Sequence, residues 1–284
     1  MTSRRDFLKS SAALACALAL NDNRVWGLVR IPLGVQLYTV RQVAEKNLPE
    51  TLAKIRKIGY QEVETYGGIY TYPAAQLQYM IQQAGLAVPS GHFDYDTLVQ
   101  QLPYANQLGL KWVVCPMIPH SMWTLEGFHA AAKQLNEFGK RAQALGMRFA
   151  FHNHNYEFAD YGGGKTGYEI LVAETDPELV FFELDCYWAV QAGHDPLRMM
   201  ERMGKRIRML HLKDRKPGFP ISYDMGPSSA HFVPVGKGSI DWRPILAEGE
   251  RLEIEHYFVE QDDTYGHPFK SISESYKDLL KLMA

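Results

Sequence analysis

Short runs of β-branched and aromatic residues alternate along the chain with longer segments in which apolar residues recur every three or four positions. The short runs predict strands, and the longer segments predict amphipathic helices. The alternation repeats about eight times. The predicted strands lie at residues 33–38, 61–66, 87–92, 111–117, 147–152, 179–185, 207–212 and 256–260.

Two of the helical segments carry clear signals for where a helix begins and ends. Residues 48–60 place Pro49 one position inside the helix and Gly59 at its end, which is the usual asymmetry of these two residues. Residues 125–147 end in the same way, at Gly146. An apolar stripe predicts the buried face of this second helix, and it consists of Phe128, Ala131, Leu135, Phe138, Ala142 and Leu145.

Eight strand and helix units with nearly continuous apolar strands predict parallel strands that are buried on both faces. This pattern favours a (β/α)8 TIM barrel, formed as a single domain by residues 27–284. The alternative is a doubly wound open sheet. That fold usually carries G-x-G-x-x-G after its first strand, where this chain has "LGVQLYTVR".

Residues 214–238 form the longest segment without a helical period, and they contain three prolines before Ala230. Loops of this length are uncommon in compact domains and usually have a function. We therefore expect this segment to form a lid or a wall beside the mouth of the barrel.

The N-terminus carries the twin arginines Arg4 and Arg5, followed by Phe-Leu-Lys and an apolar run from Ala12 to Leu20. The run is too short to span a bilayer, so residues 1–26 are predicted to be a twin-arginine signal peptide with a short linker. This predicts export to the periplasm and no membrane attachment after cleavage. A formal net charge of -2 provides no basic surface for nucleic acid.

Polar side chains gather at the predicted carboxyl ends of the strands, which is where TIM barrels place their chemistry. These residues are Gln36, Tyr38, Glu64, His92, His152, His154, Glu157, Asp185, His211, Lys213 and Glu260. Burying carboxylates such as Asp185 and Glu260 in a barrel mouth is costly without a compensating cation. Nitrogen and oxygen ligands without cysteine favour a divalent ion: Mn²⁺, Co²⁺, Zn²⁺ or Mg²⁺.

The motifs "FHNHNYEF", "ELDCYWAVQAGHDP", "RMLHLKD", "VPVGKGSIDW" and "YFVEQDD" resemble the xylose isomerase-like TIM barrel superfamily. The similarity is to its sugar phosphate isomerase/epimerase branch with twin-arginine leaders. The resemblance implies that Asp185, His211 and Glu260 bind the metal. The family's fourth ligand is a glutamate on strand five, where this chain has "FAFHNH", so that position holds His152 or, in another register, Ala150. Either His152 is the fourth ligand, or the metal has three protein ligands and water.

The resemblance implies that, in the sugar epimerases, two metal-binding glutamates lie on opposite faces of the substrate. One removes a proton next to a carbonyl, and the other returns a proton. Here only Glu260 matches, which leaves His152 or His154 to act on the other face. Lys213 is available to neutralise an oxyanion. The residues predicted to contact the sugar are Gln36, Tyr38, Glu64, His92, Glu157 and Trp188.

The sequence therefore predicts a metal-dependent isomerase or epimerase that acts on an unphosphorylated sugar or keto-sugar through an enediolate. The alternative is a metal-dependent lyase, dehydratase or hydratase of keto-sugars or keto-glycosides, as in the inosose dehydratases that the sequence also resembles. A third hypothesis is a sugar-binding barrel without catalysis. The expected partner is a small sugar, and the sequence is also compatible with a homo-oligomer.

Overall fold

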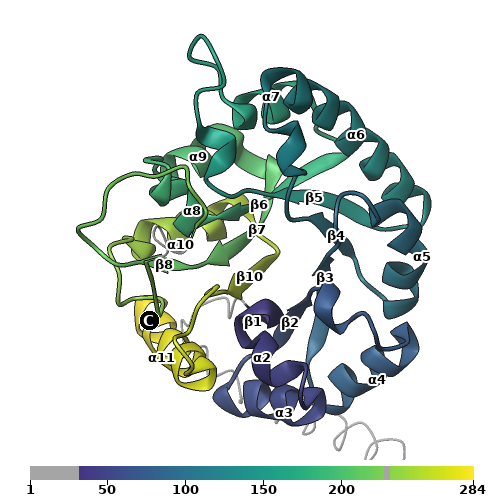
Figure 1. Ribbon diagram of the computed structural model, residues 1–284. Helices are drawn as coiled ribbons and strands as arrows, with labels where there is room; N and C mark the ends of the chain where they lie inside the picture. The colour runs from purple at the N-terminus through teal and green to yellow at the C-terminus, as the bar shows by residue number, and fades with distance from the viewer. Residues whose placement is uncertain (1–31, 227–230) are drawn as a thin grey trace, which may run out of the picture. The chain divides into compact units, whose positions relative to one another are not determined.

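The computed structural model describes residues 32–226 and 231–284. The predicted signal peptide at residues 1–26 lies outside the described residues. Within them, eight parallel strands close into a barrel in the order β1-β10-β7-β6-β5-β4-β3-β2, and helices surround it (Figure 1). This confirms the predicted (β/α)8 TIM barrel.

All eight predicted strands are present. Two of them, β3 and β7, have the predicted bounds, and the others are one to three residues shorter. The barrel strands are β1 (Leu33–Gln36), β2 (Glu62–Thr65), β3 (Ala87–His92), β4 (Trp112–Cys115), β5 (Arg148–His152), β6 (Val180–Asp185), β7 (Ile207–Leu212) and β10 (His256–Val259). The first strand ends early because Gln36 accepts a hydrogen bond from the backbone N–H of Tyr38 and begins a 3-10 turn.

Helices alternate with these strands along the chain. The α-helices are α2 (Arg41–Ala44), α3 (Leu48–Ile58), α4 (Ala74–Gln83), α5 (Leu98–Leu108), α6 (Leu125–Ala144), α7 (Gly167–Glu174), α8 (Cys186–Gln191), α9 (Pro196–Met203), α10 (Trp242–Leu252) and α11 (Pro268–Leu282). Short 3-10 helices are η1 (Leu37–Val40), η2 (Gly67–Ile69), η3 (His120–Met122), η4 (Tyr156–Phe158) and η5 (Gly204–Arg206). None of the described helices is long and apolar enough to cross a membrane.

The predicted signals at the helix ends are confirmed for α3. The side chain of Asn47 accepts a hydrogen bond from the backbone N–H of Glu50, and Gly59 ends the helix with a φ of 128°. In α6 the predicted apolar stripe is buried except at its end. The inclusion of Leu145 was wrong: the helix ends at Ala144, and Leu145 is 40% exposed.

Side chains alternate along each strand between the barrel interior and the surrounding helices. On β5, Phe149 faces outward and packs against Phe138 of α6, with ring centroids 5.8 Å apart. Ala150 faces the interior, in a cluster with Trp112, Val114, Met209 and Phe258. His152, two residues later, therefore also points inward at the carboxyl end of β5. His152 is thus the residue of β5 that meets Asp185, His211 and Glu260, and its role as a ligand stays a prediction.

The amino ends of the strands, at the opposite end of the barrel from these polar residues, carry a second set of charged pairs. Glu62, at the start of β2, lies 2.8 Å from Nδ1 of His256, at the start of β10. Glu255 accepts hydrogen bonds from Arg148 and from the indole of Trp112. These pairs satisfy buried polar groups at the base of the barrel and lie on strand starts, away from the mouth.

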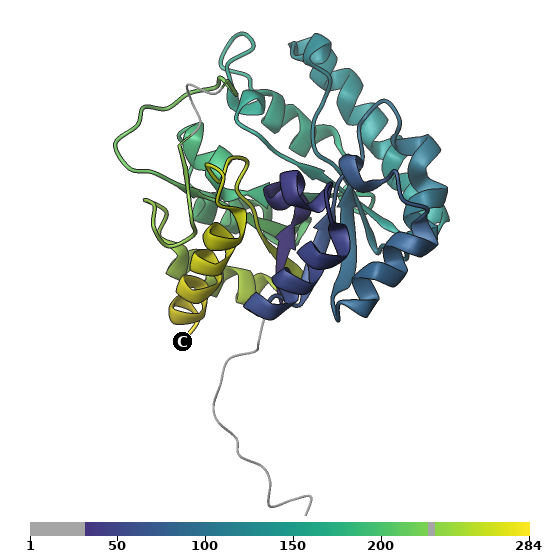
Figure 2. The same ribbon diagram turned by 60° about the horizontal axis from the view of Figure 1, so that its bottom comes forward.

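The long segment after β7 is held in place at both ends. Its strands β8 (Asp214–Arg215) and β9 (Phe232–Val233) pair antiparallel. The buried carboxylate of Asp214 accepts hydrogen bonds from the backbone of Gly236 and Gly238 and from the indole of Trp242. The described part of the intervening loop (Figure 2, green) accepts hydrogen bonds from Asn155 at the carbonyls of residues 222 and 224.

Candidate functional site

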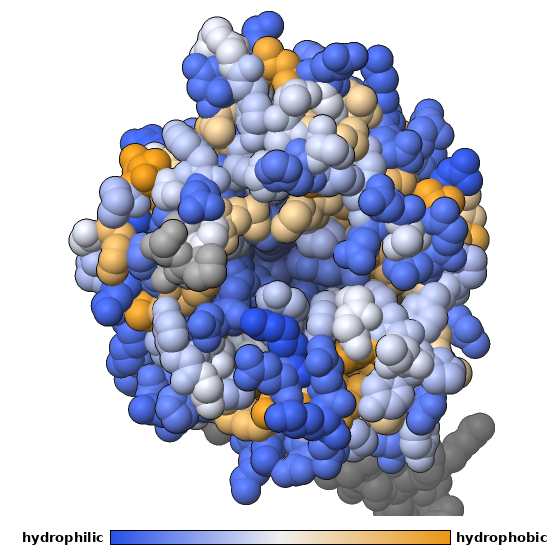
Figure 3. All heavy atoms as spheres, viewed as in Figure 1, coloured by the Kyte–Doolittle hydropathy of each residue, from blue (hydrophilic) through white to orange (hydrophobic). Residues whose placement is uncertain are grey.

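A cavity of about 770 Å³ opens at the carboxyl end of the barrel, within the range of small-molecule sites. The space-filling view shows this face hollowed at its centre, with mainly hydrophilic atoms in the hollow (Figure 3). Its lining includes His92, His152, His154 and Glu260. Met225 and Phe232 line it from the long segment, which confirms that segment as a wall of the mouth.

Four residues from four neighbouring strands bring possible metal ligands together. His152, Asp185, His211 and Glu260 each offer one ligand atom, and these atoms lie within 4.8 Å of one another. Nδ1 of His211 is 2.9 Å from Oε2 of Glu260, and Nε2 of His152 is 3.8 Å from Oδ2 of Asp185. The set is the one that the sequence analysis proposed, and its role as ligands stays a prediction.

The chemistry of these residues fits a divalent cation. Oδ2 of Asp185 and Oε1 of Glu183 are buried and accept no hydrogen bond, although Nζ of Lys213 lies 2.9 Å from the former. Around the four residues, carboxylates outnumber the fixed positive charge. Lys213 pairs with Asp185, Glu260 and Asp262, and two more carboxylates, Glu64 and Glu183, contact His211. Such an excess of buried negative charge is costly unless a cation offsets it. Two imidazoles and two carboxylates suit a borderline ion such as Zn²⁺, Co²⁺ or Mn²⁺.

Two further buried carboxylates, Glu64 and Glu183, lie beside this set, and His92, which lines the cavity, contacts both. Nε2 of His92 is 2.9 Å from Glu183 and 3.2 Å from Glu64. His152, Glu183, His92 and His211 also have ligand atoms within 4.8 Å of one another. The sequence analysis missed Glu183. It precedes Asp185 by two positions on β6, so the period-two alternation of a strand was the signal that places both side chains inside the barrel.

The pKa values in this cluster show where the metal-free protein holds its protons. Burial lowers the pKa of His211, but Glu183 and Glu260 outweigh burial and raise it well above its usual value. For His92, burial is likewise opposed by Glu64 and Glu183, which raise the pKa to about 9. Burial, together with the positive charge of His211, holds the pKa of His152 well below its usual value. In the metal-free protein, the protonated imidazoles of His92 and His211 therefore offset part of the carboxylate charge. A bound cation would take over this role.

Lys213 is 1% exposed, and its Nζ lies 2.9 Å from Asp185, 2.7 Å from Glu260 and 3.0 Å from Asp262. Burial alone would lower the pKa of Lys213, but the ion pairs outweigh it and raise this pKa well above its usual value. Lys213 is therefore a fixed buried cation beside two of the candidate ligands.

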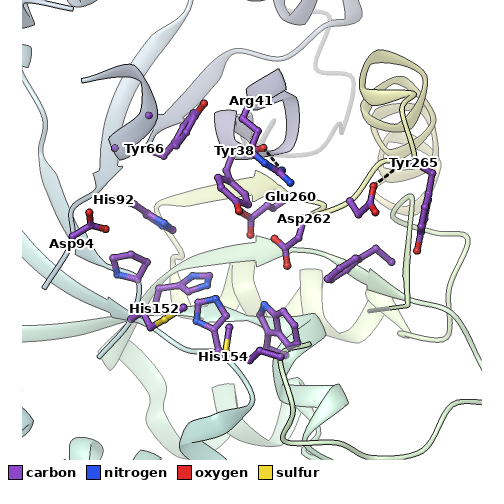
Figure 4. Close-up of a pocket in the computed structure, with 18 residues that line it drawn as sticks. Tyr38, Arg41, Tyr66, His92, Asp94, His152, His154, Glu260, Asp262 and Tyr265 are labelled. Carbon is purple, nitrogen blue, oxygen red and sulfur yellow. Dashed lines mark hydrogen bonds between the residues drawn. The ribbon is translucent and has the colours of Figure 1, made fainter. Parts of the chain in front are cut away.

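His154 lies beside the ligand set and borders the cavity. Its ring is 5.0 Å from that of His152 and 5.5 Å from that of Trp188, between ring centroids. Burial, and then the charge of Lys213, lower the pKa of His154 to about 3, so its imidazole is neutral at working pH. Nδ1 of this ring has no hydrogen-bond partner. Figure 4 shows His92, His152 and His154 facing Glu260 and Asp262.

The residues predicted to contact a sugar fall into two groups. Tyr38, His92 and Trp188 line the cavity. The others are fully buried around it: Gln36 donates to Glu64, and Glu157 accepts from the backbone N–H of His154 at 3.0 Å. Burial raises the pKa of Glu157 to about 8. Gln36, Glu64 and Glu157 hold other polar groups in place and do not line the cavity.

The rim of the cavity is aromatic. Tyr38 and Tyr66 meet edge to face, with ring centroids 5.6 Å apart, and the guanidinium of Arg41 lies 4.0 Å from the centre of the Tyr38 ring. Tyr265, which is 60% exposed, stands on the other side of the opening (Figure 4). Polar groups below and aromatic rings above suit a ligand with hydroxyl groups and an apolar face.

The chain belongs to the xylose isomerase-like TIM barrel family, whose model matches residues 52–262. Among solved structures, it is similar to a sugar phosphate isomerase/epimerase from Parabacteroides distasonis. The TM-score is 0.76, with 24% identity, over 88% of this chain and 97% of the other. At this identity the likeness shows the fold.

Among curated proteins, the chain is similar to inosose dehydratases. It is 24% identical over 259 residues to that of Geobacillus kaustophilus, which covers 78% of this chain and 82% of the relative. It is 29% identical over 157 residues to that of Clostridium beijerinckii, which covers 51% of each. The match thus spans about half the length of this second relative.

Proposed function

We propose that this protein is a metal-dependent carbon-oxygen lyase that removes water from a keto-sugar or a keto-polyol. The observation that carries the proposal is a pocket that combines a four-residue ligand set with a neutral histidine, in a chain whose curated relatives are named inosose dehydratase. The sequence analysis placed isomerisation first, and the relatives favour its alternative.

In this proposal His152, Asp185, His211 and Glu260 hold the divalent ion. A divalent ion at such a site polarises a substrate carbonyl and makes the neighbouring C–H more acidic. The candidate ions are Mn²⁺, Co²⁺, Zn²⁺ and Mg²⁺.

His154 takes the proton from the carbon next to the carbonyl. Its low pKa keeps the ring neutral and able to accept a proton, but also makes it a weak base, so the carbon must be strongly activated. Lys213 keeps its positive charge beside Glu260 and offsets negative charge that develops on the substrate. The aromatic rim around Tyr38 excludes water from one side of the bound ring.

The replacement on β5 supports elimination over epimerisation. An epimerase of this family, as the resemblance implies, needs two carboxylates that act on opposite faces of the substrate. In this proposal His152 takes the place of one of them, because Ala150, the other candidate on β5, has no ligand atom and lies in the apolar interior. A single imidazole beside the pocket suits removal of one proton from carbon, which it then returns to the departing hydroxyl group, so that water leaves.

The test is to strip the purified protein of metal, reload it with each of the four ions, and incubate it with inososes and other keto-sugars in D₂O. A product lighter by one water, formed only with metal, supports the proposal. A substrate isomer that carries solvent deuterium, without loss of water, would instead support the epimerase. Binding without turnover across the panel would support a sugar-binding barrel.

We also propose, from the twin arginines at residues 4 and 5, that the protein is exported to the periplasm. Cell fractionation with Arg4→Lys and Arg5→Lys together tests this: the pair of substitutions should leave the protein in the cytoplasm. Equal periplasmic amounts for parent and variant would refute the export route.

A further inference from the structure

The two histidines of the ligand set each lie between two carboxylates. In His211, Nδ1 is 2.9 Å from Glu260, and Nε2 is 2.6 Å from Glu64. In His152, Nε2 is 3.8 Å from Asp185, and Nδ1 is 3.2 Å from Glu183. Both rings therefore present one nitrogen to the layer of Asp185 and Glu260 and the other nitrogen to a deeper layer.

A neutral imidazole has one nitrogen with a free lone pair and one N–H group, so it binds a metal with one side and donates a hydrogen bond with the other. The two layers consequently compete for the ion. If the ion lies between Asp185 and Glu260, the N–H groups of both rings point at Glu64 and Glu183. If the ion lies in the deeper layer, Glu183 becomes a ligand together with His92, His152 and His211.

Three observations assign the ion to the outer layer. Glu260 and His152 line the cavity, whereas Glu64 and Glu183 are 0% exposed and do not. Glu64 already accepts hydrogen bonds from Gln36 and Ser90 as well as from His211. Oε2 of Glu183 likewise lies within 3.2 Å of three imidazoles, those of His92, His152 and His211.

We propose that Glu64 and Glu183 are positioning residues that orient the metal-binding histidines. Glu64 accepts the Nε2–H of His211, and Glu183 accepts the Nδ1–H of His152, which fixes the tautomer in which the opposite nitrogen binds the ion. His92 lies between the two carboxylates, 3.2 Å from Glu64 and 2.9 Å from Glu183, and holds them in register. This inference rests on the metal centre of the proposed function.

The experiment measures Co²⁺ affinity of the metal-free protein by competition with a chelator, and records the visible spectrum of bound Co²⁺. Glu64→Gln and Glu183→Gln keep a carbonyl oxygen that accepts the N–H but remove the charge. Each should weaken Co²⁺ binding by about 10- to 100-fold, as is typical of such partners, while the spectrum keeps its band positions. Asp185→Asn, which changes a ligand, should alter the spectrum.

The barrel offers a matched control on the same strand. Glu62 also accepts a hydrogen bond from a histidine, His256, at 2.8 Å, but at the amino end of β2. Glu62→Gln therefore removes the same charge from the same kind of pair, two residues from Glu64. It should leave the Co²⁺ affinity within a factor of about two of the parent's.

The outcomes separate this inference from the proposed function. Equal affinities for Glu62→Gln, Glu64→Gln and Glu183→Gln would overturn the positioning role. Abolished binding in Glu183→Gln with a normal spectrum in Asp185→Asn would overturn it too, because the ion would then lie in the deeper layer. The expected affinities in a protein without lyase turnover would support the inference and refute the proposed activity. A parent that binds no Co²⁺ would overturn both.

Discussion

Replacing Lys213 with methionine tests whether the buried carboxylates at the mouth of the barrel need a compensating cation. The ammonium of Lys213 lies 2.9 Å from Asp185, 2.7 Å from Glu260 and 3.0 Å from Asp262. Methionine fills a similar volume without the charge. Lys213→Met therefore leaves these carboxylates uncompensated in the metal-free protein.

The contacts set the size of the effect. At these distances each pair is worth about 6 kcal/mol in Coulomb energy at an effective dielectric constant of about 20. The cost of removing the ammonium from water offsets much of the sum, and breaking a buried pair from one side typically costs about 3–5 kcal/mol. We expect Lys213→Met to lower the unfolding free energy of the metal-free protein by about 3–5 kcal/mol. With a divalent ion bound, the loss should be roughly half as large, because the ion carries the compensating charge.

The assay is urea unfolding of parent and variant, each after chelation and after reloading with Co²⁺. Lys237→Met is the control, because Lys237 also pairs with an aspartate, Asp278, at 2.9 Å but is 51% exposed. A surface pair of this kind contributes at most about 1 kcal/mol. An equal loss for Lys213→Met with and without metal would refute the idea that the ion and the lysine share one electrostatic role. A loss no greater than that of the control would refute the buried network.

Three further predictions follow from the same geometry. His154→Gln should lower kcat by about 10²- to 10⁴-fold while metal analysis shows full occupancy, and lost metal would show that His154 is a ligand instead. Phe258→Ala, in the apolar interior of the barrel, should cost about 3–5 kcal/mol of unfolding free energy in urea, and a loss below 1 kcal/mol would contradict the packing. Co²⁺ affinity should keep rising with pH above the usual histidine pKa of about 6.5, because Glu183 and Glu260 outweigh burial and raise the pKa of His211, whose proton must leave before it binds metal; a flat profile would contradict this.

Much of the architecture follows from local pattern. The strand predictions hold because each strand is buried on both faces and therefore reads as an apolar run, and Gly59 ends α3 because its positive φ suits glycine. The barrel needs a residue of minimal size opposite Phe258: a Cβ on Gly34 would stand 2.4 Å from that ring. The limit on size at Gly34 comes from Phe258 on the neighbouring strand β10, and no pattern within β1 predicts it.

Part of the candidate site could also be predicted from local sequence pattern. Residues at strand ends share one rim whenever parallel strands close into a barrel, so the sequence alone predicted that His152, Asp185, His211 and Glu260 meet. The register of β5 was left open between His152 and Ala150. In the structure Ala150 lies in the apolar interior with Phe258, and His152 follows on the same face beside Asp185 and His211; that His152 binds metal stays a prediction.

The sequence by itself determined the fold, the strand order along the chain and the types of polar residue at the mouth, because these depend on hydrophobic period and on the rule that strand ends meet. The tertiary structure alone decided which nitrogen of each histidine faces which carboxylate. Glu64 and His211 are 147 residues apart and lie within 2.6 Å, and Lys213 becomes a buried cation through carboxylates from other strands. Tautomers and charge balance depend on three-dimensional neighbours, which the period of a single strand does not encode.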